Sequence, residues 1–482
     1  MPAITILGLG PGGPDLLTRR AWKAITAAPE IWVRTRRHPA LEGLPASVQV
    51  HSFDALYETL PSFEEVYARI VEEVLTLGQR PEGVLYAVPG DPFVAEATAP
   101  EIARRAREMG IPLSLVGGMS FLEPVWAALG VDPFPRTALV DALTLGARHV
   151  PDFPPDVPAL IAQIYDRHTA SEVKLTLLSV YPDEHPVKLV HAAGTPQEMV
   201  EALPLYAIDR SPHIGLLTAL YLPPLGEATS FEGFHEVVAH LRAPDGCPWD
   251  RKQTHQSLRA DLLEEAYEVL EALDAADPRA LQEELGDLLL HIFLQAQIAA
   301  EEGEFRLADV VRGIHTKIVR RHPHVFGELS LADEDEVLAN WEKLKAAERQ
   351  ANGEAEKGVL DGVSAALPAL AQAQAYQSRA ARVGFDWPER EPVWEKLQEE
   401  LAEFRAAGTP EERQAEYGDI LMALVNLARW DRIDAETALR EANARFRARF
   451  AYIEAQARAQ GRSLDSMSLA EMDALWNEAK AK

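Results

Sequence analysis

The sequence of 482 residues contains a single cysteine, Cys247, and no uninterrupted apolar stretch long enough to cross a membrane. One cysteine excludes an intramolecular disulfide framework and is typical of a reducing compartment. Basic residues are also few, because 47 Lys and Arg stand against 75 Asp and Glu, for a net charge of −28. Nucleic-acid backbones and anionic membranes attract basic patches. We therefore expect a cytoplasmic protein with no nucleic-acid partner and no membrane partner.

Acidic residues, in contrast, form a pattern that occurs twice in the second half of the chain. Each copy is an E-E-x-x-E segment followed, after a short connection, by an E-x-x-D segment. On a helix, positions three and four apart share a face, so two such helices facing each other would repel without a cation between them. Mg²⁺ prefers oxygen ligands and often completes its shell with substrate phosphates. The pattern predicts a metal-dependent nucleotide site, formed by Glu264, Glu265, Glu268, Glu284 and Asp287 in the first copy and by Glu399, Glu400, Glu403, Glu416 and Asp419 in the second.

An alternative interpretation is a solvated acidic face, since an acidic chain places carboxylate pairs on exposed helices by chance. Apolar neighbours such as Leu262, Tyr267 and Leu288 favour buried helices for the first copy. Acids are rarely buried without a partner or a metal. The competing function is a non-catalytic helical interaction or regulatory module attached to a methyltransferase, and Mg²⁺ binding would separate the two.

The chain changes character near its middle. Residues 3–225 alternate short apolar runs, at 4–7, 31–33, 84–88, 113–116, 174–178 and 216–221, with helical segments such as 62–77 and 98–109. This alternation predicts an α/β domain. Pro223 and Pro224 mark a linker, and from residue 231 the apolar period is helical, with a second break at 352–358. We expect three domains, at 1–225, 231–350 and 360–482, of which the last two are all-α.

The two all-α halves show matched features in the same order, which indicates an internal repeat. The acidic pattern recurs, Trp341 corresponds to Trp476, and basic residues precede each tryptophan. These basic residues are candidate phosphate contacts. They are Lys317, Arg320 and Arg321 in the first half and Arg445 and Arg449 in the second.

Several motifs carry a resemblance to a known family. They are the G-C-P-W-D stretch at 246–250, K-Q-T-H at 252–255, L-E-E-A-Y-E at 263–268, E-L-G-D-L-L at 284–289 and R-R-H-P-H-V-F at 320–326. Together they resemble a MazG-type nucleoside triphosphate pyrophosphohydrolase, and V-G-F-D-W at 383–387 with E-Y-G-D-I-L at 416–421 resembles a second module of that family. The resemblance implies an all-α fold, a homodimer and hydrolysis of nucleoside triphosphates with Mg²⁺ or Mn²⁺.

Hydrolysis between the α and β phosphates needs an activated water and neutralised charge on the leaving pyrophosphate. We assign Glu264 and Glu399 as ligands or water-orienting bases, and the remaining acids of each pattern as metal ligands. The second half lacks the C-P-W-D and R-R-H-P-H segments. The sequence therefore leaves open whether both modules are active.

Glycine-rich loops in the first half carry another resemblance. L-G-L-G-P-G-G at 7–13, P-G-D-P at 89–92 and G-G-M-S at 117–120 resemble the tetrapyrrole methylase superfamily, which uses S-adenosylmethionine. The resemblance implies cofactor binding by Gly8, Gly10, Gly12, Pro89, Gly90, Asp91 and Ser120. A dinucleotide site is the alternative, with Glu30 as its acid. A methylase domain followed by MazG modules is similar to the YabN-type fusion proteins, and whether the domain transfers a methyl group stays open.

Overall fold

The computed structural model describes residues 3–331 and 358–481 and, of the segment between them, residues 333, 336, 337, 340, 341, 344 and 348. The chain divides into two compact units, Met1–Lys252 and Gln253–Lys482. The expected break at 352–358 falls almost wholly outside the described residues, and the bounds of the three expected domains stay a prediction. No helix within the described residues is long and apolar enough to span a membrane.

The first unit begins with a sheet of five parallel strands in the order β3-β2-β4-β1-β5. The strands are β1 (Ile4–Gly8), β2 (Glu30–Val33), β3 (Gln49–Ser52), β4 (Val84–Val88) and β5 (Leu113–Val116). Ile6 lies opposite Tyr86 on one side and Leu115 on the other. Because residues alternate across a strand, Ile6 and Leu7 enter different cores on the two faces of the sheet.

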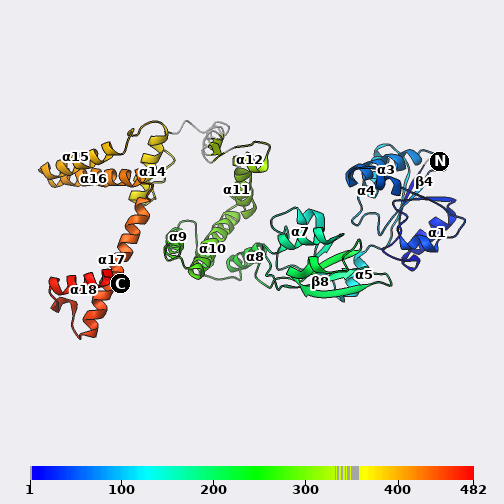
Figure 1. The fold of residues 1–482 in the computed structure, drawn as a ribbon, viewed down its shortest axis with the longest axis horizontal. Helices are drawn as coiled ribbons and strands as arrows, with labels where there is room; N and C mark the ends of the chain where they lie inside the picture. The colour runs from blue at the N-terminus through cyan, green and yellow to red at the C-terminus, as the bar shows by residue number, and fades with distance from the viewer. Residues whose placement is uncertain are drawn as a thin grey trace. The chain divides into compact units, whose positions relative to one another are not determined.

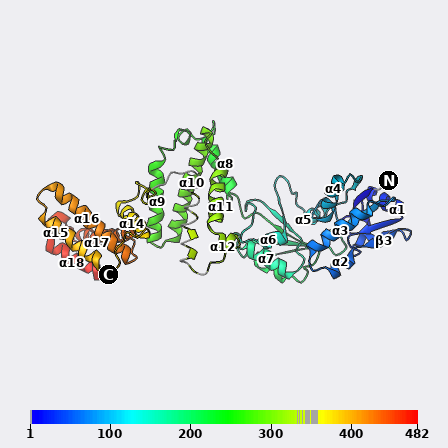
Figure 2. The same cartoon turned by 90° about the horizontal axis from the view of Figure 1, so that it is seen from above.

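Helices cover both faces of this sheet. On one face, α3 (Phe63–Leu77) and α4 (Thr98–Glu108) lie side by side and pack on Ile6 and Tyr86 (Figure 2). On the other face, α1 (Arg19–Ala27) packs its Ile25 against Leu7. The short α2 (Asp54–Thr59) precedes α3. The α/β class, the first four expected strands and both expected helices are therefore confirmed.

A second five-stranded sheet follows in the same unit, in the order β6-β7-β10-β8-β9 (Figure 1). Its strands are β6 (Ala138–Asp141), β7 (Ala159–Ala162), β8 (Pro186–His191), β9 (Met199–Pro204) and β10 (Thr218–Leu222). Only β6 and β7 are parallel, and the other pairs are antiparallel. One face packs on α6 (Ala142–Gly146) and α7 (Arg167–Leu177), and the other packs on α5 (Leu122–Leu129).

The strand expected at 174–178 is wrong, because this segment lies at the end of α7. The carboxylate of Asp166 caps the helix by accepting a hydrogen bond from the Thr169 backbone N–H at 2.8 Å. Val173 and Leu177, four residues apart, face the core, whereas Leu175 is 65% exposed. The apolar residues therefore follow the helical period of 3.6 and not the strand period of 2.

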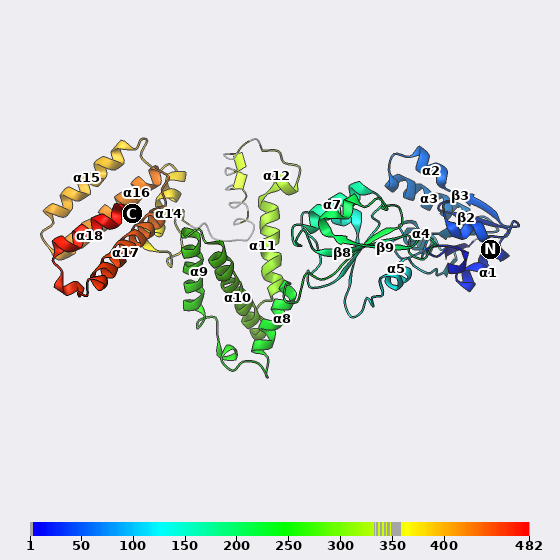
Figure 3. The ribbon, with the colours of Figure 1, turned by 60° about the horizontal axis from the view of Figure 1, so that its bottom comes forward.

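The last α-helix of the first unit is α8 (Phe231–Arg242), and the described residues of the second unit form helices and no strand. The helices of the second unit are α9 (Arg259–Asp274), α10 (Pro278–Glu302), α11 (Leu307–Arg321), α12 (Pro323–Phe326), α14 (Ala369–Arg382), α15 (Glu391–Ala406), α16 (Pro410–Trp430), α17 (Ala435–Ala459) and α18 (Leu469–Ala481). Two of its helix pairs matter for the site. Helices α9 and α10 form one hairpin (Figure 3), and α15 and α16 form the other (Figure 1).

Each half of this unit contains the same kind of side-chain contact, in which an arginine lies over a tryptophan. The guanidinium of Arg321 lies over the ring of Trp341 at 6.0 Å, and that of Arg449 lies over the ring of Trp476 at 5.5 Å. Such cation–π contacts are attractive. The same pairing in both halves agrees with the duplication that the sequence indicates.

Candidate functional site

The first carboxylate cluster lies in the α9–α10 hairpin. Asp277 caps α10 by accepting hydrogen bonds from the first turn, so that the chain reverses directly after α9. Carboxylate oxygens of Glu265 and Glu268 on α9 and of Glu284 on α10 all lie within 4.8 Å of one another. Three of the expected metal ligands are thus brought together.

The charges of this cluster act on one another. Desolvation raises the pKa of Glu265, and the negative charges of Asp287, Glu268 and Glu284 raise it further. The pKa of Glu284 is raised for the same reasons, with Asp287 again among the causes. Among the residues that the structure describes, none of these four acids forms an ion pair with a lysine or an arginine. The cluster therefore concentrates negative charge that an added cation would stabilise.

The second cluster repeats this arrangement in the α15–α16 hairpin. Carboxylate oxygens of Glu400, Glu416 and Asp419 lie within 4.8 Å of one another, and Glu400 is only 6% exposed. Desolvation and then the charges of Glu403, Glu400 and Asp419 raise the pKa of Glu416. Thr409 opens α16 with a capping box and so fixes where the second helix begins. Glu403 contributes its charge but lies outside the tightest group.

A lysine that the sequence analysis did not single out belongs to the second cluster. Lys396 Nζ lies 2.8 Å from a carboxylate oxygen of Glu400 and 3.0 Å from one of Glu399. Hydrogen bonds to Glu400 and Glu399 raise the pKa of Lys396 above its usual value. Asp261 stands one turn before Glu265, where Lys396 stands one turn before Glu400. A lysine four residues before a buried glutamate is the signal that could have identified it.

The two residues expected as bases lie beside the clusters. Glu264 and Glu399 are both exposed, and neither belongs to the groups of converging oxygens. Glu399 is instead paired with Lys396. Their role in orienting water stays a prediction.

Four of the five expected phosphate contacts have protein partners of their own. Arg320 and Arg321 each lie 2.7 Å from a carboxylate oxygen of Glu348, and Arg445 lies 3.4 Å from Glu441. Lys317 is exposed on α11, and Arg449 lies over Trp476. Within the described parts of the chain, none of the five forms an ion pair with an acid of either cluster. Phosphate binding by these residues stays a prediction.

In the first unit, the three glycine-rich loops gather at one edge of the first sheet. They follow β4, β1 and β5, which are neighbours in the sheet, and ligands of such sheets bind beyond the carboxyl ends of the strands. The backbones of Gly10 and Gly90 exchange two hydrogen bonds, of 3.1 and 2.8 Å. A Cβ atom at Gly8 or at Gly118 would lie 2.4 or 2.2 Å from the Gly90 carbonyl oxygen. These glycines therefore allow the loops to approach each other closely.

Asp91 links two of these loops. Its carboxylate accepts a hydrogen bond from the Gly118 backbone N–H at 3.1 Å and one from the Phe93 N–H at 2.9 Å. Ser120 is buried and donates a hydrogen bond to Glu123 at 2.6 Å. The structure thus places Gly8, Gly10, Gly90, Asp91 and Ser120 together at this edge of the sheet. Pro89 opens the loop after β4. Gly12 lies against another segment, because a Cβ atom there would be 2.5 Å from the Gly194 carbonyl oxygen.

One titratable group at this edge, His38, belongs to no sequence motif, whereas the acid expected for a dinucleotide site lies elsewhere. Burial lowers the pKa of His38 to about 4, with a backbone hydrogen bond to Gly10 acting against burial, so the imidazole beside the glycine loop is neutral at pH 7. Glu30, the acid of the dinucleotide alternative, opens β2 and is ion-paired with Arg80 at 2.6 Å. It therefore lies at the amino end of its strand, away from the loops, and does not support a ribose contact.

Two segments of the chain match known protein families. The family of tetrapyrrole (corrin/porphyrin) methylases matches residues 3–209, and the MazG nucleotide pyrophosphohydrolase domain matches residues 253–326, which hold the first carboxylate cluster. The chain is 45% identical to YabN of Bacillus subtilis, a protein described as uncharacterised, over 99% of this chain and 98% of that protein. This chain belongs to the YabN family.

In this chain a tetrapyrrole methylase match precedes a MazG match, which confirms the expected order of the two. Two shorter relatives match the MazG region. The chain is 41% identical to the MazG nucleoside triphosphate pyrophosphohydrolase/pyrophosphatase of Thermotoga maritima, over 52% of this chain and 95% of that protein. It is also 41% identical to the nucleoside triphosphate pyrophosphohydrolase of Escherichia coli, over 51% of this chain and 94% of that protein.

Proposed function

We propose that this protein hydrolyses nucleoside triphosphates to the monophosphate and pyrophosphate, with Mg²⁺ or Mn²⁺ held by its carboxylate clusters. One observation carries the proposal. Glu265, Glu268 and Glu284 converge within 4.8 Å in the region that matches the MazG domain. Relatives named as nucleoside triphosphate pyrophosphohydrolases support the substrate class.

The residues present fit a hard divalent cation. All ligand atoms of both clusters are carboxylate oxygens, which Mg²⁺ prefers, and the raised pKa of Glu265 and of Glu416 reflects like charges that a cation would relieve. Glu265, Glu268, Glu284 and Asp287 would hold the ion in the first module, and Glu400, Glu403, Glu416 and Asp419 in the second. When bound, the ion would lower the pKa of a water and neutralise negative charge on the phosphates.

The remaining residues of the chain would position the substrate. Glu264 and Glu399, exposed beside the clusters, would accept the proton of the attacking water. Arg320 and Arg321 would exchange Glu348 for substrate phosphate, since both ligands accept paired hydrogen bonds from guanidinium groups. Lys317, Arg445 and Arg449 would contribute positive charge along α11 and α17.

We also propose a homodimer. Val311, Ile314 and Ile318 lie three and four residues apart on α11 and are 57%, 46% and 41% exposed. Apolar residues at this spacing form a continuous stripe on one helix face. Large exposed apolar surface on a soluble protein is typical of an interface. A second copy of the chain would cover this stripe.

For the first unit we propose binding of S-adenosylmethionine at the three loops. The support is the match of residues 3–209 to the tetrapyrrole methylases and the placement of the loops on adjacent strands. The proposal covers binding of the cofactor and not transfer of its methyl group.

Calorimetric titration of the full chain with Mg²⁺, with and without a nonhydrolysable triphosphate, tests the hydrolase against the acidic interaction module. The proposal predicts binding that the nucleotide strengthens and that is lost when Glu265→Gln and Glu400→Gln are combined. Glu411→Gln, a change at an exposed acid in the first turn of α16 and outside both clusters, is a control that should bind like the wild type. Absence of Mg²⁺ binding in the wild type would favour the interaction module.

A further inference from the structure

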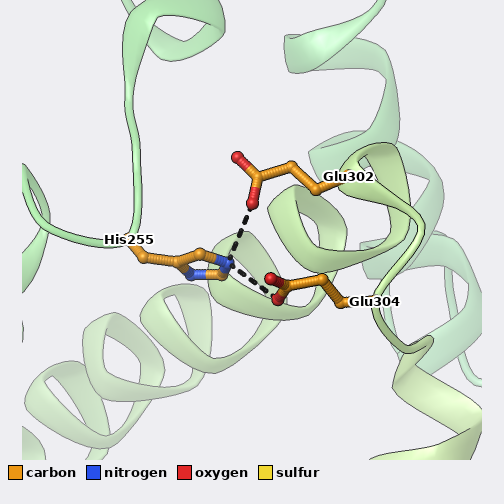
Figure 4. A group of neighbouring side chains, drawn as sticks. All are labelled: His255, Glu302 and Glu304. Atoms are coloured by element: carbon orange, nitrogen blue, oxygen red, sulfur yellow. Dashed lines mark ion pairs between the residues drawn. The ribbon is translucent and has the colours of Figure 1, made fainter.

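Three side chains with metal-ligating atoms that belong to neither carboxylate cluster converge. Nε2 of His255 lies 3.9 Å from a carboxylate oxygen of Glu302 and 3.8 Å from one of Glu304 (Figure 4). The three ligand atoms all lie within 4.8 Å of one another. Glu302 ends α10, about 27 Å along the helix from Glu284 at about 1.5 Å per residue. The group is therefore separate from the proposed hydrolase site.

The other nitrogen of the imidazole is already engaged. Nδ1 of His255 is hydrogen-bonded to Oε1 of Gln295, an amide oxygen that can only accept. Nδ1 therefore donates this hydrogen bond, and Nε2 faces the two carboxylates. Metal-ligating histidines are oriented in the same way, with the free ring N–H held by a neighbouring acceptor.

Nε2 of His255 is buried and has no hydrogen-bond partner among the described residues. Its distances to both carboxylates exceed the range of a hydrogen bond. A proton on Nε2 would therefore have no acceptor within reach. Two metal–ligand bonds of about 2.0–2.2 Å each would span the gap to either carboxylate after a small adjustment.

We propose that His255, Glu302 and Glu304 bind a divalent transition-metal ion such as Zn²⁺, with water completing its shell. Imidazole nitrogen combined with carboxylate oxygen suits Zn²⁺ better than Mg²⁺, which prefers oxygen alone. His255 precedes α9, whereas Glu302 and Glu304 flank Gly303, at which α10 ends with a positive φ of 76°. The ion would join the segment before α9 to the end of α10.

Titration of the untagged full chain with Zn²⁺, in excess Mg²⁺ to occupy the carboxylate clusters, tests this site. The wild type should bind one more equivalent of Zn²⁺ than His255→Ala and than Glu304→Gln, a change at a side chain that is 55% exposed. His315→Ala, a change at an exposed histidine on α11, is the matched control and should keep that equivalent. Gln295→Ala should bind the ion about 10- to 100-fold more weakly, because it removes the group that orients the ring.

Thermal melting gives an independent measurement. Zn²⁺ should raise the melting temperature of the wild type and of His315→Ala, and should not raise that of Glu304→Gln. Equal Zn²⁺ stoichiometry and affinity in the wild type and in His255→Ala would overturn the site. A wild type that binds no Zn²⁺ in excess Mg²⁺ would overturn it as well. Both results are independent of whether the carboxylate clusters hydrolyse nucleotides.

Discussion

Lys396 Nζ lies 2.8 Å from a carboxylate oxygen of the buried Glu400, so the second carboxylate cluster contains a cation of its own. The first cluster has Asp261 at the corresponding place, one turn before Glu265. The two halves therefore carry the same acids but differ at this position, which is a lysine in the second half and an aspartate in the first. The two modules should differ in how strongly they bind Mg²⁺ before substrate arrives.

Lys396→Met should strengthen Mg²⁺ binding at the second cluster by about two- to fivefold, because an ammonium no longer competes for Glu400. Calorimetry in a Glu265→Gln background would isolate the second cluster. Lys317→Met, which removes an exposed lysine outside both clusters, should leave Mg²⁺ binding unchanged in the same background. Equal affinities for the Lys396 and Lys317 variants would show that the lysine does not compete with the metal.

Combining Glu265→Gln with Glu400→Gln should abolish hydrolysis and leave the fold intact, since amides keep the side-chain volume and relieve repulsion among the remaining acids. Steady-state assays of each single variant would assign turnover to one module or divide it between both. Circular dichroism would check the helices. Activity near the wild-type level in the double variant would refute the assignment of metal ligands.

The metal-free protein should show a distinct pH dependence. The pKa of Glu265 and that of Glu284 are raised above the ordinary value of 4.5. A group with a raised folded-state pKa contributes stability that is present below the unfolded pKa and is lost as pH rises through the folded pKa. Without metal, Glu265→Gln should therefore melt above the wild type at pH 7, and the difference should shrink as pH falls toward 4.5.

Melting curves in a chelator, and again in Mg²⁺, would measure this difference. Mg²⁺ should reverse its sign at pH 7, because only the wild type retains all the ligands and metal binding needs unprotonated carboxylates. A difference that is the same at every pH would contradict the charge repulsion within the cluster.

Asp91→Ala should weaken binding of S-adenosylhomocysteine and lower the stability of the first unit by about 1–3 kcal/mol, because it leaves the Gly118 and Phe93 N–H groups without their acceptor. Asp91→Asn retains one acceptor oxygen, so its binding affinity and its stability should lie between those of the wild type and of Asp91→Ala. Titration and melting of the full chain would measure both effects. Strong binding of NAD, without binding of S-adenosylhomocysteine, would instead favour a dinucleotide site.

The sequence predicted well what depends on local periodicity and on paired motifs. The acids three and four residues apart on α9 and α10 do converge, because a helix hairpin places matching faces together. Sequence reasoning took 174–178 for a strand, because a short apolar run satisfies both periods until a cap such as Asp166 is considered. It also missed Lys396 and the His255 group. The spacing of Lys396 four residues before Glu400 is present in the sequence, whereas the partners of His255 depend on where α10 ends, which motif spacing does not encode.

The products formed from nucleoside triphosphates in the presence of Mg²⁺ distinguish a pyrophosphohydrolase from an enzyme that releases orthophosphate. Each of the common ribo- and deoxyribonucleoside triphosphates would be incubated with the full chain, and pyrophosphate and orthophosphate would be measured separately. Pyrophosphate and the monophosphate should appear in equal amounts, and only when a divalent cation is present. Orthophosphate and the diphosphate as the main products, or release of pyrophosphate that persists in a chelator, would contradict a metal-dependent pyrophosphohydrolase.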